Sequence, residues 1–214
     1  MTHPIWPLFD LEVVTPKLTL RYVDDDLASE LAMLAARGVH DPGDTPFRFA
    51  WTDVEPPEQQ PNTLRHHWAL RSGTSASAWT LALAVIVKGQ AIGTTSIEAK
   101  DFPLLRTVST GSWLGIDFHG RGFGKELRRA TLALAFRGLD AEVANTAAWH
   151  DNGGSLGVTR SLGYAPVGRE FERRRDRRDQ MLTFTMDRPA FDRLTTGDIE
   201  LRGCERARGF LQID

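Results

Sequence analysis

Three glycines stand close together in the part of the chain that most strongly suggests ligand chemistry. Gly120, Gly122 and Gly124 follow an apolar strand pattern, and the cationic Arg121 and Lys125 are interleaved with them. Glycine lets the backbone approach a ligand closely and adopt positive φ. An amphipathic helix pattern begins here, and the free N–H groups at a helix start favour an anion. The segment therefore predicts a cradle for a phosphate or pyrophosphate group.

Two familiar phosphate-binding motifs fail at single residues of this segment. A dinucleotide fingerprint requires glycine where Lys125 stands. A Walker A loop requires Ser or Thr after Gly124 and Lys125, and Glu126 stands there instead. A purely structural alternative also stays open, in which the glycines serve only the packing of a strand-to-helix turn.

A second polar segment contains Asn152 and Ser155. Residues 153–157 formally match the G-x-S-x-G nucleophile motif of α/β-hydrolases. That fold places an Asp and then a His after the serine, and the last histidine of this chain is His150. The pattern therefore disfavours a serine hydrolase. Asn152 also suits the N-cap of a short helix.

Hydrophobic periodicity indicates the elements that must position these residues. Strands are predicted at 18–23, 79–87, 91–99, 107–115, 142–149, 166–174 and 180–186. Helices are predicted over 27–35, 62–71, 125–138 and 156–162. We expect Asn62 to cap the second helix, with Leu64, Trp68 and Arg71 on one side. Residues 40–61 are rich in Pro, Asp and Gly and predict an irregular, mobile segment over a site.

The order of these elements favours an α/β fold. The expected sheet is mixed and largely antiparallel, with helices on both faces. Residues 102–103 are expected to lie in a loop. One domain is expected over residues 1–194, and residues 195–214, which carry no clear pattern, are expected to form a C-terminal tail.

The composition narrows the class of protein. The chain has 214 residues, a net charge of −2 and a pI near 6.3, so it has no global basic field for nucleic acid or an anionic membrane. The single cysteine, Cys204, excludes an internal disulfide and a Cys-rich zinc site. The start shows no signal-peptide pattern, and the longest apolar run is roughly a third of a membrane span. We expect a cytoplasmic protein with no metal, nucleic-acid or membrane partner.

Residues 169–178 form a strongly charged run in which three acids interrupt the arginines. A solvated hairpin turn with internal ion pairs is the preferred interpretation. As an alternative, some of these arginines reach an acidic acceptor or an anionic acyl group.

Two motifs together resemble those of one enzyme family. Residues 119–124 resemble the Q/R-x-x-G-x-G/A pyrophosphate loop of the GCN5-related N-acetyltransferases (GNAT), with His119 where Gln or Arg is usual. Asn152 and Ser155, followed by Leu162-Gly163-Tyr164, resemble the family's N-x-x-S…L-G-F/Y element. The resemblance covers roughly residues 6–190 and is strongest to the Rim-type branch. Stretches at 6–11, 38–42, 100–103 and 111–115 are similar to an actinobacterial subgroup in which some members use succinyl-CoA.

The resemblance implies a GNAT-type splayed sheet and an N-acyltransferase that moves an acetyl or succinyl group from coenzyme A to an amine by direct attack. The acceptor amine would belong to a protein N-terminus, a lysine or a small molecule. A non-catalytic acyl-CoA-binding regulatory module is the alternative. Exposed strand edges make a homodimer or higher homo-oligomer an expectation. The residues implied at the cofactor are Trp113, Leu114, His119, Gly120, Arg121, Gly122, Phe123, Gly124, Lys125, Asn152 and Ser155.

The family's chemistry also implies catalytic roles. Ser155 is the candidate proton donor to the leaving thiolate, because Thr159 stands where many members have a tyrosine acid. Asn152 is expected to position this segment. Glu98 is the candidate base that deprotonates the amine, with Asp101 as an alternative. Backbone N–H groups near Trp113 are expected to stabilise the oxyanion.

Overall fold

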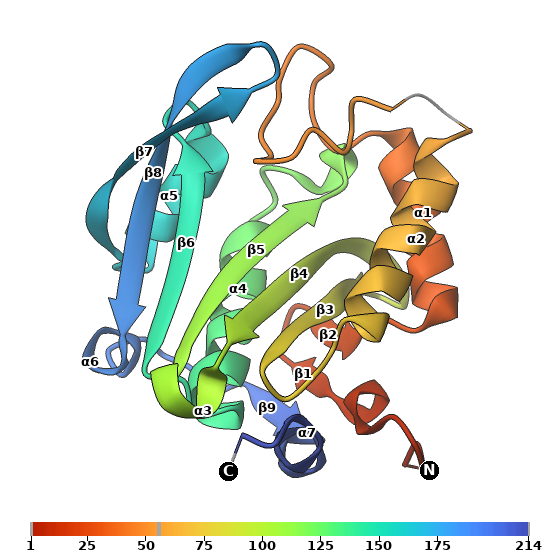
Figure 1. Ribbon diagram of the computed structural model, residues 1–214, viewed down its shortest axis with the longest axis vertical. Coiled ribbons are helices and arrows are strands. Elements are labelled where there is room, and N and C mark those ends of the chain that lie inside the picture. The colour runs from red at the N-terminus through yellow and green to blue at the C-terminus, as the bar shows by residue number, and fades with distance from the viewer. Residues whose placement is uncertain (1, 55–56, 214) are drawn as a thin grey trace.

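A single nine-stranded sheet forms the centre of the computed structural model, which describes residues 2–54 and 57–213 (Figure 1). The strands lie in the order β7-β8-β6-β5-β4-β3-β2-β1-β9. Their bounds are β1 Glu12–Val14, β2 Thr19–Tyr22, β3 Ala78–Val87, β4 Gln90–Lys100, β5 Thr107–Leu114, β6 Val143–Trp149, β7 Ala165–Arg174, β8 Arg177–Asp187 and β9 Glu200–Arg202.

Helices connect and cover these strands. The α-helices are α1 Asp25–Arg37, α2 Gln59–Ser72, α3 Phe102–Leu105, α4 Phe123–Ala133, α5 Gly153–Ser161, α6 Arg188–Phe191 and α7 Cys204–Leu211. Short 3₁₀ turns lie at Pro7–Asp10 and Ile116–Phe118, and α4 continues into a π-helical turn at Leu134–Gly138. No helix in the described ranges is both long and apolar enough to cross a bilayer.

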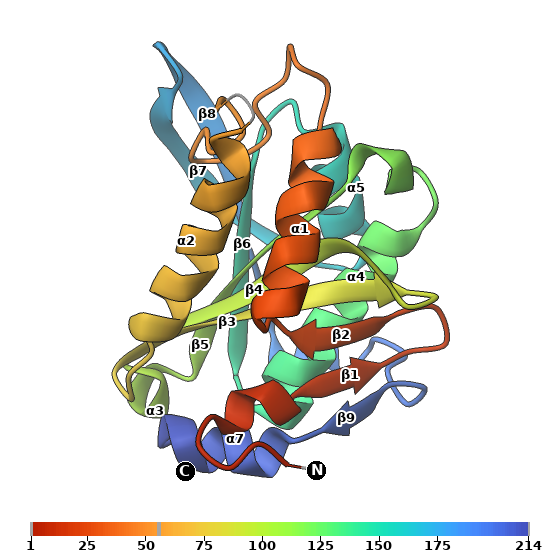
Figure 2. The same ribbon diagram turned by 90° about the vertical axis from the view of Figure 1, so that its right-hand side faces the viewer.

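The two faces of the sheet bury different side chains. On β3, the large Leu81 and Leu83 belong to the core that includes Leu127 of α4, whereas the small Ala82 packs in the cluster that includes Leu31 of α1. Side chains alternate between faces along a strand, so one strand supplies both layers. Figure 2 shows α1 and α2 on one side of the sheet and α4 on the other. The prediction of a mixed, largely antiparallel sheet with helices on both faces is confirmed.

β5 and β6 are the one parallel pair of this sheet, and they separate along their length. Their pairing runs from Thr107 opposite Val143 to Ser109 opposite Asn145, and beyond this point the two strands diverge (Figure 1). β5 stays paired with β4 as far as Leu114, opposite Gly93. The outer part of β5 therefore keeps a free edge on the side that faces β6, which is the splay expected from the sequence resemblance.

Helix α2 differs from its prediction in its start. It begins at Gln59, so Asn62 lies inside the first turn and the predicted cap at Asn62 is wrong. Trp68 and Arg71, predicted on one side of the helix, both donate to Asp25 of α1, the Trp68 Nε1 at 3.1 Å. The buried side chains of α2 are the polar Gln59, Thr63 and His67, whereas Trp68 is 49% exposed. The inward face is therefore polar, and apolar periodicity could not identify it.

Several short elements had no signal in the sequence. The predicted loop at 102–103 is the single-turn helix α3. Strand β9 pairs with β1, and α7 follows it, so the segment after residue 194 forms regular structure within this fold. Leu211 and Ile213 are fully buried there. The domain boundary at residue 194 stays a prediction, but this segment is packed against the domain and is not a loose tail.

Candidate functional site

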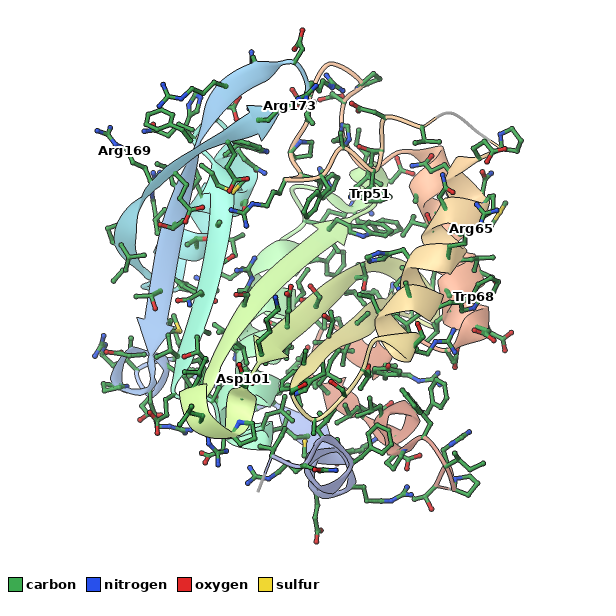
Figure 3. The ribbon with its side chains drawn as sticks, in the orientation of Figure 1. Trp51, Arg65, Trp68, Asp101, Arg169 and Arg173 are labelled. Carbon is green, nitrogen blue, oxygen red and sulfur yellow. The ribbon has the colours of Figure 1, made fainter. Side chains whose placement is uncertain are left out.

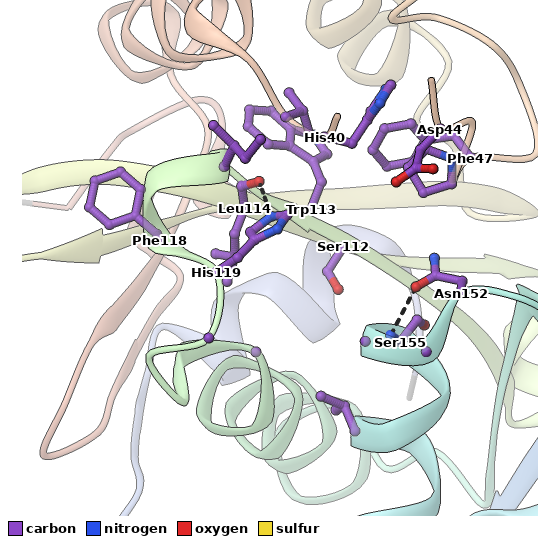
Figure 4. A pocket seen from close by; sticks show the side chains of 18 of the residues that line it. His40, Asp44, Phe47, Ser112, Trp113, Leu114, Phe118, His119, Asn152 and Ser155 are labelled. Carbon is purple, nitrogen blue, oxygen red and sulfur yellow. Dashed lines mark hydrogen bonds between the residues drawn. The ribbon is translucent and has the colours of Figure 1, made fainter. Parts of the chain in front are cut away.

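A cavity of about 770 Å³ occupies the gap where β5 and β6 separate. Three segments meet around it: residues 39–47 from the stretch between α1 and α2, the loop that leads into α4, and the turn that begins α5 (Figure 4). We call residues 39–54 the roof segment. Of the residues predicted at the cofactor, those on the cavity wall are Trp113, Leu114, His119, Gly120, Gly122, Gly124, Lys125, Asn152 and Ser155. Arg121 and Phe123 flank them in the same loop.

The glycine loop has the conformation that a phosphate cradle requires. Gly120 and Gly122 adopt φ of +70° and +80°, and a Cβ added to either would meet no atom within 4 Å. The space beside both residues is therefore open, and their backbone is one that other residues rarely adopt. Gly122 caps α4, whose first N–H groups have no partner within the helix. With Lys125 exposed beside it, this loop fits a pyrophosphate.

Gly124 differs in its surroundings from the other two glycines. It does not have a positive φ, and an added Cβ would lie 3.6 Å from Cγ2 of Val158 on α5. This distance is an ordinary van der Waals contact, so neither the backbone conformation nor the packing of α4 against α5 requires glycine at this position.

His119 connects the glycine loop to β5. Its Nε2 lies 3.0 Å from the carbonyl oxygen of Leu114 (Figure 4). This contact fixes the start of the loop against the strand that borders the cavity. At the position where the family usually has Gln or Arg, this chain therefore has an imidazole that contacts the backbone of β5.

The free edge of β5 presents backbone groups to the cavity. The carbonyl of Thr110 accepts from Thr146 of β6, and the carbonyl of Leu114 accepts from His119. The carbonyl of Gly111 instead accepts from Thr95 on the β4 side. Because strand backbone groups alternate in direction, the N–H and C=O of Ser112 face the gap, and Ser112 lines the cavity. Sequence reasoning had not identified this residue.

Asn152 and Ser155 lie together at the start of α5. The Asn152 Oδ1 accepts a hydrogen bond from the Ser155 backbone N–H at 3.0 Å, so Asn152 is the N-cap (Figure 4). The Ser155 side chain is half-buried on the cavity wall. Thr159, one turn later, is 1% exposed and does not line the cavity. Among the described residues of α5, the serine is therefore the hydroxyl group at this end of the cavity.

The roof segment is fastened to the β6–β8 side of the sheet. Trp149 Nε1 donates to the Phe47 carbonyl at 3.0 Å, and Arg174 Nε donates to the Thr45 carbonyl at 2.8 Å. Arg175 pairs with Asp53 at 2.7 Å, and Arg48 pairs with Glu172. The segment lies over the cavity, as its composition predicted, but these bonds fasten it where mobility was predicted.

Aromatic and imidazole rings stiffen the roof segment from within. Phe47 contacts Trp51 with ring centroids 5.1 Å apart, and Trp51 lies 5.5 Å from Trp113 of β5. His40 bonds the Asp41 carbonyl through Nδ1 at 2.8 Å and the Thr52 hydroxyl through Nε2 at 2.7 Å. Both nitrogens of His40 are thus engaged, so this ring orders the segment.

Arg174 shows that the charged run at 169–178 is not uniformly solvated. Its side chain is 7% exposed, lines the cavity, and lies over the Trp149 ring at 5.0 Å. Its Nη1 donates to Asp151 at 2.8 Å and to Asp179 at 3.1 Å. The backbone N–H of Gln180 and the Arg174 guanidinium hold the pKa of Asp179 at about 2. The internal ion pairs expected for this run are present, but one of them is buried.

Asp151 and Asp179 also belong to a group of possible metal ligands, the one such group found in the described part of the chain. Ligand atoms of His150, Asp151 and Asp179 lie within 4.8 Å of one another. Arg174 already donates to both carboxylates. Its positive charge compensates the acids, so this grouping functions as an ion-pair network around the turn that leads to Asn152.

Glu98 does not lie with the other predicted catalytic residues. It is exposed on β4 and lines a separate, shallow pocket of about 170 Å³ with Trp79 and Lys100. Asp101 lies still further along, and Figure 3 shows it at the opposite end of the sheet from Trp51. The carboxylates on the main cavity wall are Asp41, Asp44 and Asp151. The sequence had no signal for Asp44, because it stands in an irregular segment without periodicity.

A splayed sheet with a glycine-rich loop at the gap is the arrangement that the sequence resemblance implied, and comparison with known families agrees. The family model described as the acetyltransferase (GNAT) domain matches residues 17–165. The chain therefore belongs to the GNAT acetyltransferase family.

Solved structures support the same fold. RimL, a ribosomal L7/L12 α-N-protein acetyltransferase solved with coenzyme A, has a TM-score of 0.67 at 16% identity, over 83% of this chain and 97% of that one. The ribosomal-protein-S5-alanine acetyltransferase of Vibrio fischeri has a TM-score of 0.65 at 17% identity, over 83% and 97%. A GCN5-related N-acetyltransferase of Brucella melitensis has a TM-score of 0.65 at 18% identity, over 87% and 86%. The similarity to the actinobacterial subgroup stays a prediction.

Proposed function

We propose that the protein transfers an acetyl or succinyl group from acyl-CoA to an amine by direct attack. One observation supports this most strongly: the cavity joins the open glycine cradle at Gly120 and Gly122 to the free edge of β5 and to Ser155. A phosphate-binding end, a strand edge and a polar reacting end thus follow one another along a single cavity. This order suits a long pantetheine thioester.

Each part of the cavity has a role in this proposal. The N–H groups at the start of α4, with Arg121 and Lys125, would bind the pyrophosphate. The edge of β5 around Trp113 and Leu114 would pair with the pantetheine amides, because it has no partner in β6, and the backbone groups that face the gap there are those of Ser112 and Leu114. The Ser112 backbone N–H, which faces the gap, would stabilise the oxyanion that forms on the thioester carbonyl.

The transfer step requires two proton movements. The amine nitrogen attacks the thioester carbonyl, the C–N bond forms, the C–S bond breaks, and coenzyme A leaves as the thiolate. Ser155 would donate a proton to this thiolate, and Asn152 would hold the turn in place. A carboxylate would accept the proton that the amine loses. Glu98 remains the sequence-based candidate, and Asp41 and Asp44 are the carboxylates of the cavity wall that form no ion pair within the described part of the chain, whereas Asp151 pairs with Arg174.

The acceptor is proposed as an amine of a protein N-terminus, a lysine or a small molecule. Two proteins with the same fold are described as ribosomal-protein acetyltransferases, which favours a protein amine. A cytoplasmic location and a homodimer through an exposed strand edge stay predictions.

The proposal is tested by the release of free coenzyme A over time, with a panel of amines that includes N-terminal peptides, lysine and polyamines. An acyltransferase releases coenzyme A only when a suitable amine is present, and mass spectrometry shows the acylated amine. A regulatory module binds the thioester but gives no time-dependent release with any amine.

A further inference from the structure

Arg128 of α4 is a buried cation on the wall of the main cavity. Its side chain is 5% exposed. The Nη1 donates to the hydroxyl groups of Thr146 at 3.0 Å and Thr110 at 3.4 Å, and the Nε is buried without a hydrogen-bond partner. The guanidinium therefore has only neutral partners and is incompletely satisfied.

The position of these partners places Arg128 at the deep end of the gap. Thr110 and Thr146 directly follow Ser109 and Asn145, where the pairing of β5 and β6 ends. Because α4 begins at Phe123, Arg128 lies about 7.5 Å along the helix from its start, at the usual rise per residue. Arg128 is thus set back from the phosphate cradle and lies where the two strands meet.

The charge of Arg128 has no counter-charge in the described part of the chain. The neighbouring Arg129 pairs with Glu126 and Asp198 at 2.7 Å, and the buried Arg174 pairs with Asp151 and Asp179. Arg128 forms no ion pair with a described carboxylate. A buried charge without a partner is costly, and a planar guanidinium is suited to bind a carboxylate through two parallel bonds. An anion delivered by the ligand would supply the missing partner.

We infer that Arg128 binds the terminal carboxylate of a dicarboxylic acyl group, so that the preferred donor is an acyl-CoA of the succinyl type. The inference rests on the proposed function, because it requires coenzyme A to bind with its thioester end deep in the gap. A phosphate of coenzyme A is the other anion that could reach the cavity. In that case Arg128 would strengthen the binding of every coenzyme A derivative equally.

Two donors of matched length separate these sources of negative charge. Succinyl-CoA and butyryl-CoA have acyl chains of equal carbon number, and only the former ends in a carboxylate. We expect isothermal titration calorimetry of the wild-type protein to give a Kd for succinyl-CoA about 10- to 100-fold lower than for butyryl-CoA, the range of a charge-assisted pair. Equal Kd values for these two donors would overturn the inference without any variant.

The variant Arg128→Gln should abolish this difference and leave the Kd for coenzyme A itself within about threefold of wild type. Arg129→Gln is the matched control, since Arg129 is adjacent on α4 and does not line the cavity. This control should keep the preference for succinyl-CoA. Arg128→Lys retains the charge but not the planar guanidinium, so it should keep part of the preference for succinyl-CoA. This variant replaces Arg128→Gln in the test if the glutamine variant does not fold.

Two other outcomes contradict the inference and are distinguishable. A uniform loss of affinity for coenzyme A, butyryl-CoA and succinyl-CoA in Arg128→Gln would assign the guanidinium to the common part of the ligand. A preference for succinyl-CoA that survives Arg128→Gln would assign the carboxylate to another residue. Failure of the proposed function would look different, because the wild-type protein would then bind no coenzyme A derivative at all.

Discussion

Ser155 is the residue on which the proposed proton transfer depends. Asn152 fixes the first turn of α5 through the Ser155 N–H, and the serine side chain stays on the cavity wall. Thr159 is buried and cannot take the place of the tyrosine acid that many family members have. The residue-level geometry therefore leaves one hydroxyl group of α5 at the reacting end.

Substituting Ser155→Ala should lower kcat by about 10- to 100-fold, because the thiolate would leave without a positioned proton donor. The Kd for coenzyme A should change little, since the Asn152 cap bonds the backbone N–H and not the hydroxyl. Steady-state release of coenzyme A and calorimetry measure the two quantities. Ser161→Ala on the same helix is the control, and an unchanged kcat for Ser155→Ala would remove this residue from the mechanism.

The identity of the base can be decided between carboxylates of the cavity wall and Glu98. Asp41 and Asp44 line the cavity, whereas Glu98 lies in the separate pocket on β4. We expect Asp41→Asn or Asp44→Asn to lower kcat by at least about tenfold, because the amine would lose its proton acceptor. Glu98→Gln should leave kcat near wild type. The reverse pattern would restore the sequence-based assignment of Glu98.

At the scale of elements, the sequence predicts long periodic segments well and short or polar ones poorly. The hairpin of β3 and β4 was predicted because Trp79 and the run from Leu81 are apolar, and a Lys88–Gly89 turn separates the two strands. The cradle and Asn152 were predicted because glycine and cap positions are local signals. β1 and β9 are too short to show periodicity, and Asp44 and Arg174 reach the cavity only through tertiary contacts.

The polar inner face of α2 makes stability depend on pH. Burial, with Arg71 and His66 nearby, lowers the pKa of His67 from 6.5 to about 4. The unfolded chain therefore binds this proton more readily, so the folded state is fully stable above pH 6.5 and loses stability as the pH falls toward 4. The loss should approach about 1.4 kcal/mol per pH unit.

Urea unfolding between pH 7 and pH 4.5 measures this effect of His67. In His67→Gln the dependence of the unfolding free energy on pH should be flatter than in wild type over that range. The comparison of slopes is the readout, because the substitution can also change the stability at pH 7. Parallel slopes in the two proteins would show that His67 does not titrate with an altered pKa.

At the scale of the whole molecule, the two ends of the chain close one side of the fold. β9 extends the sheet at β1, and Arg206 of α7 bonds Asp10 and the His3 carbonyl. Ile199, Leu211 and Ile213 are at most 2% exposed. Each buried side chain of this size contributes about 1.5–3 kcal/mol, so the three together approach the net stability of a typical domain.

Deletion of residues 195–214 should therefore leave a chain that is largely unfolded at 37 °C, as measured by circular dichroism during thermal unfolding. Substituting Arg206→Gln in the full chain, which removes only the latch to Asp10, should lower the Tm by a few degrees. A truncated chain with the Tm of the full protein would show that residues 195–214 are the separate tail predicted from sequence.

The central claim is that the loop at Gly120 and Gly122 binds the phosphates of coenzyme A, and a thermal-shift titration tests it most directly. Gly122→Glu places a side chain and a negative charge in the open space of the cradle. Gly163→Glu is the matched control, since Gly163 has φ of +81°, open space around its Cβ and no place on the cavity wall.

Coenzyme A at a hundred times its Kd should stabilise the wild-type protein and Gly163→Glu by about 2.7 kcal/mol through mass action. Gly122→Glu should fold but show no rise in Tm with the ligand. An equal rise in all three proteins, or no rise in the wild type, would contradict the assignment of this cavity to acyl-CoA.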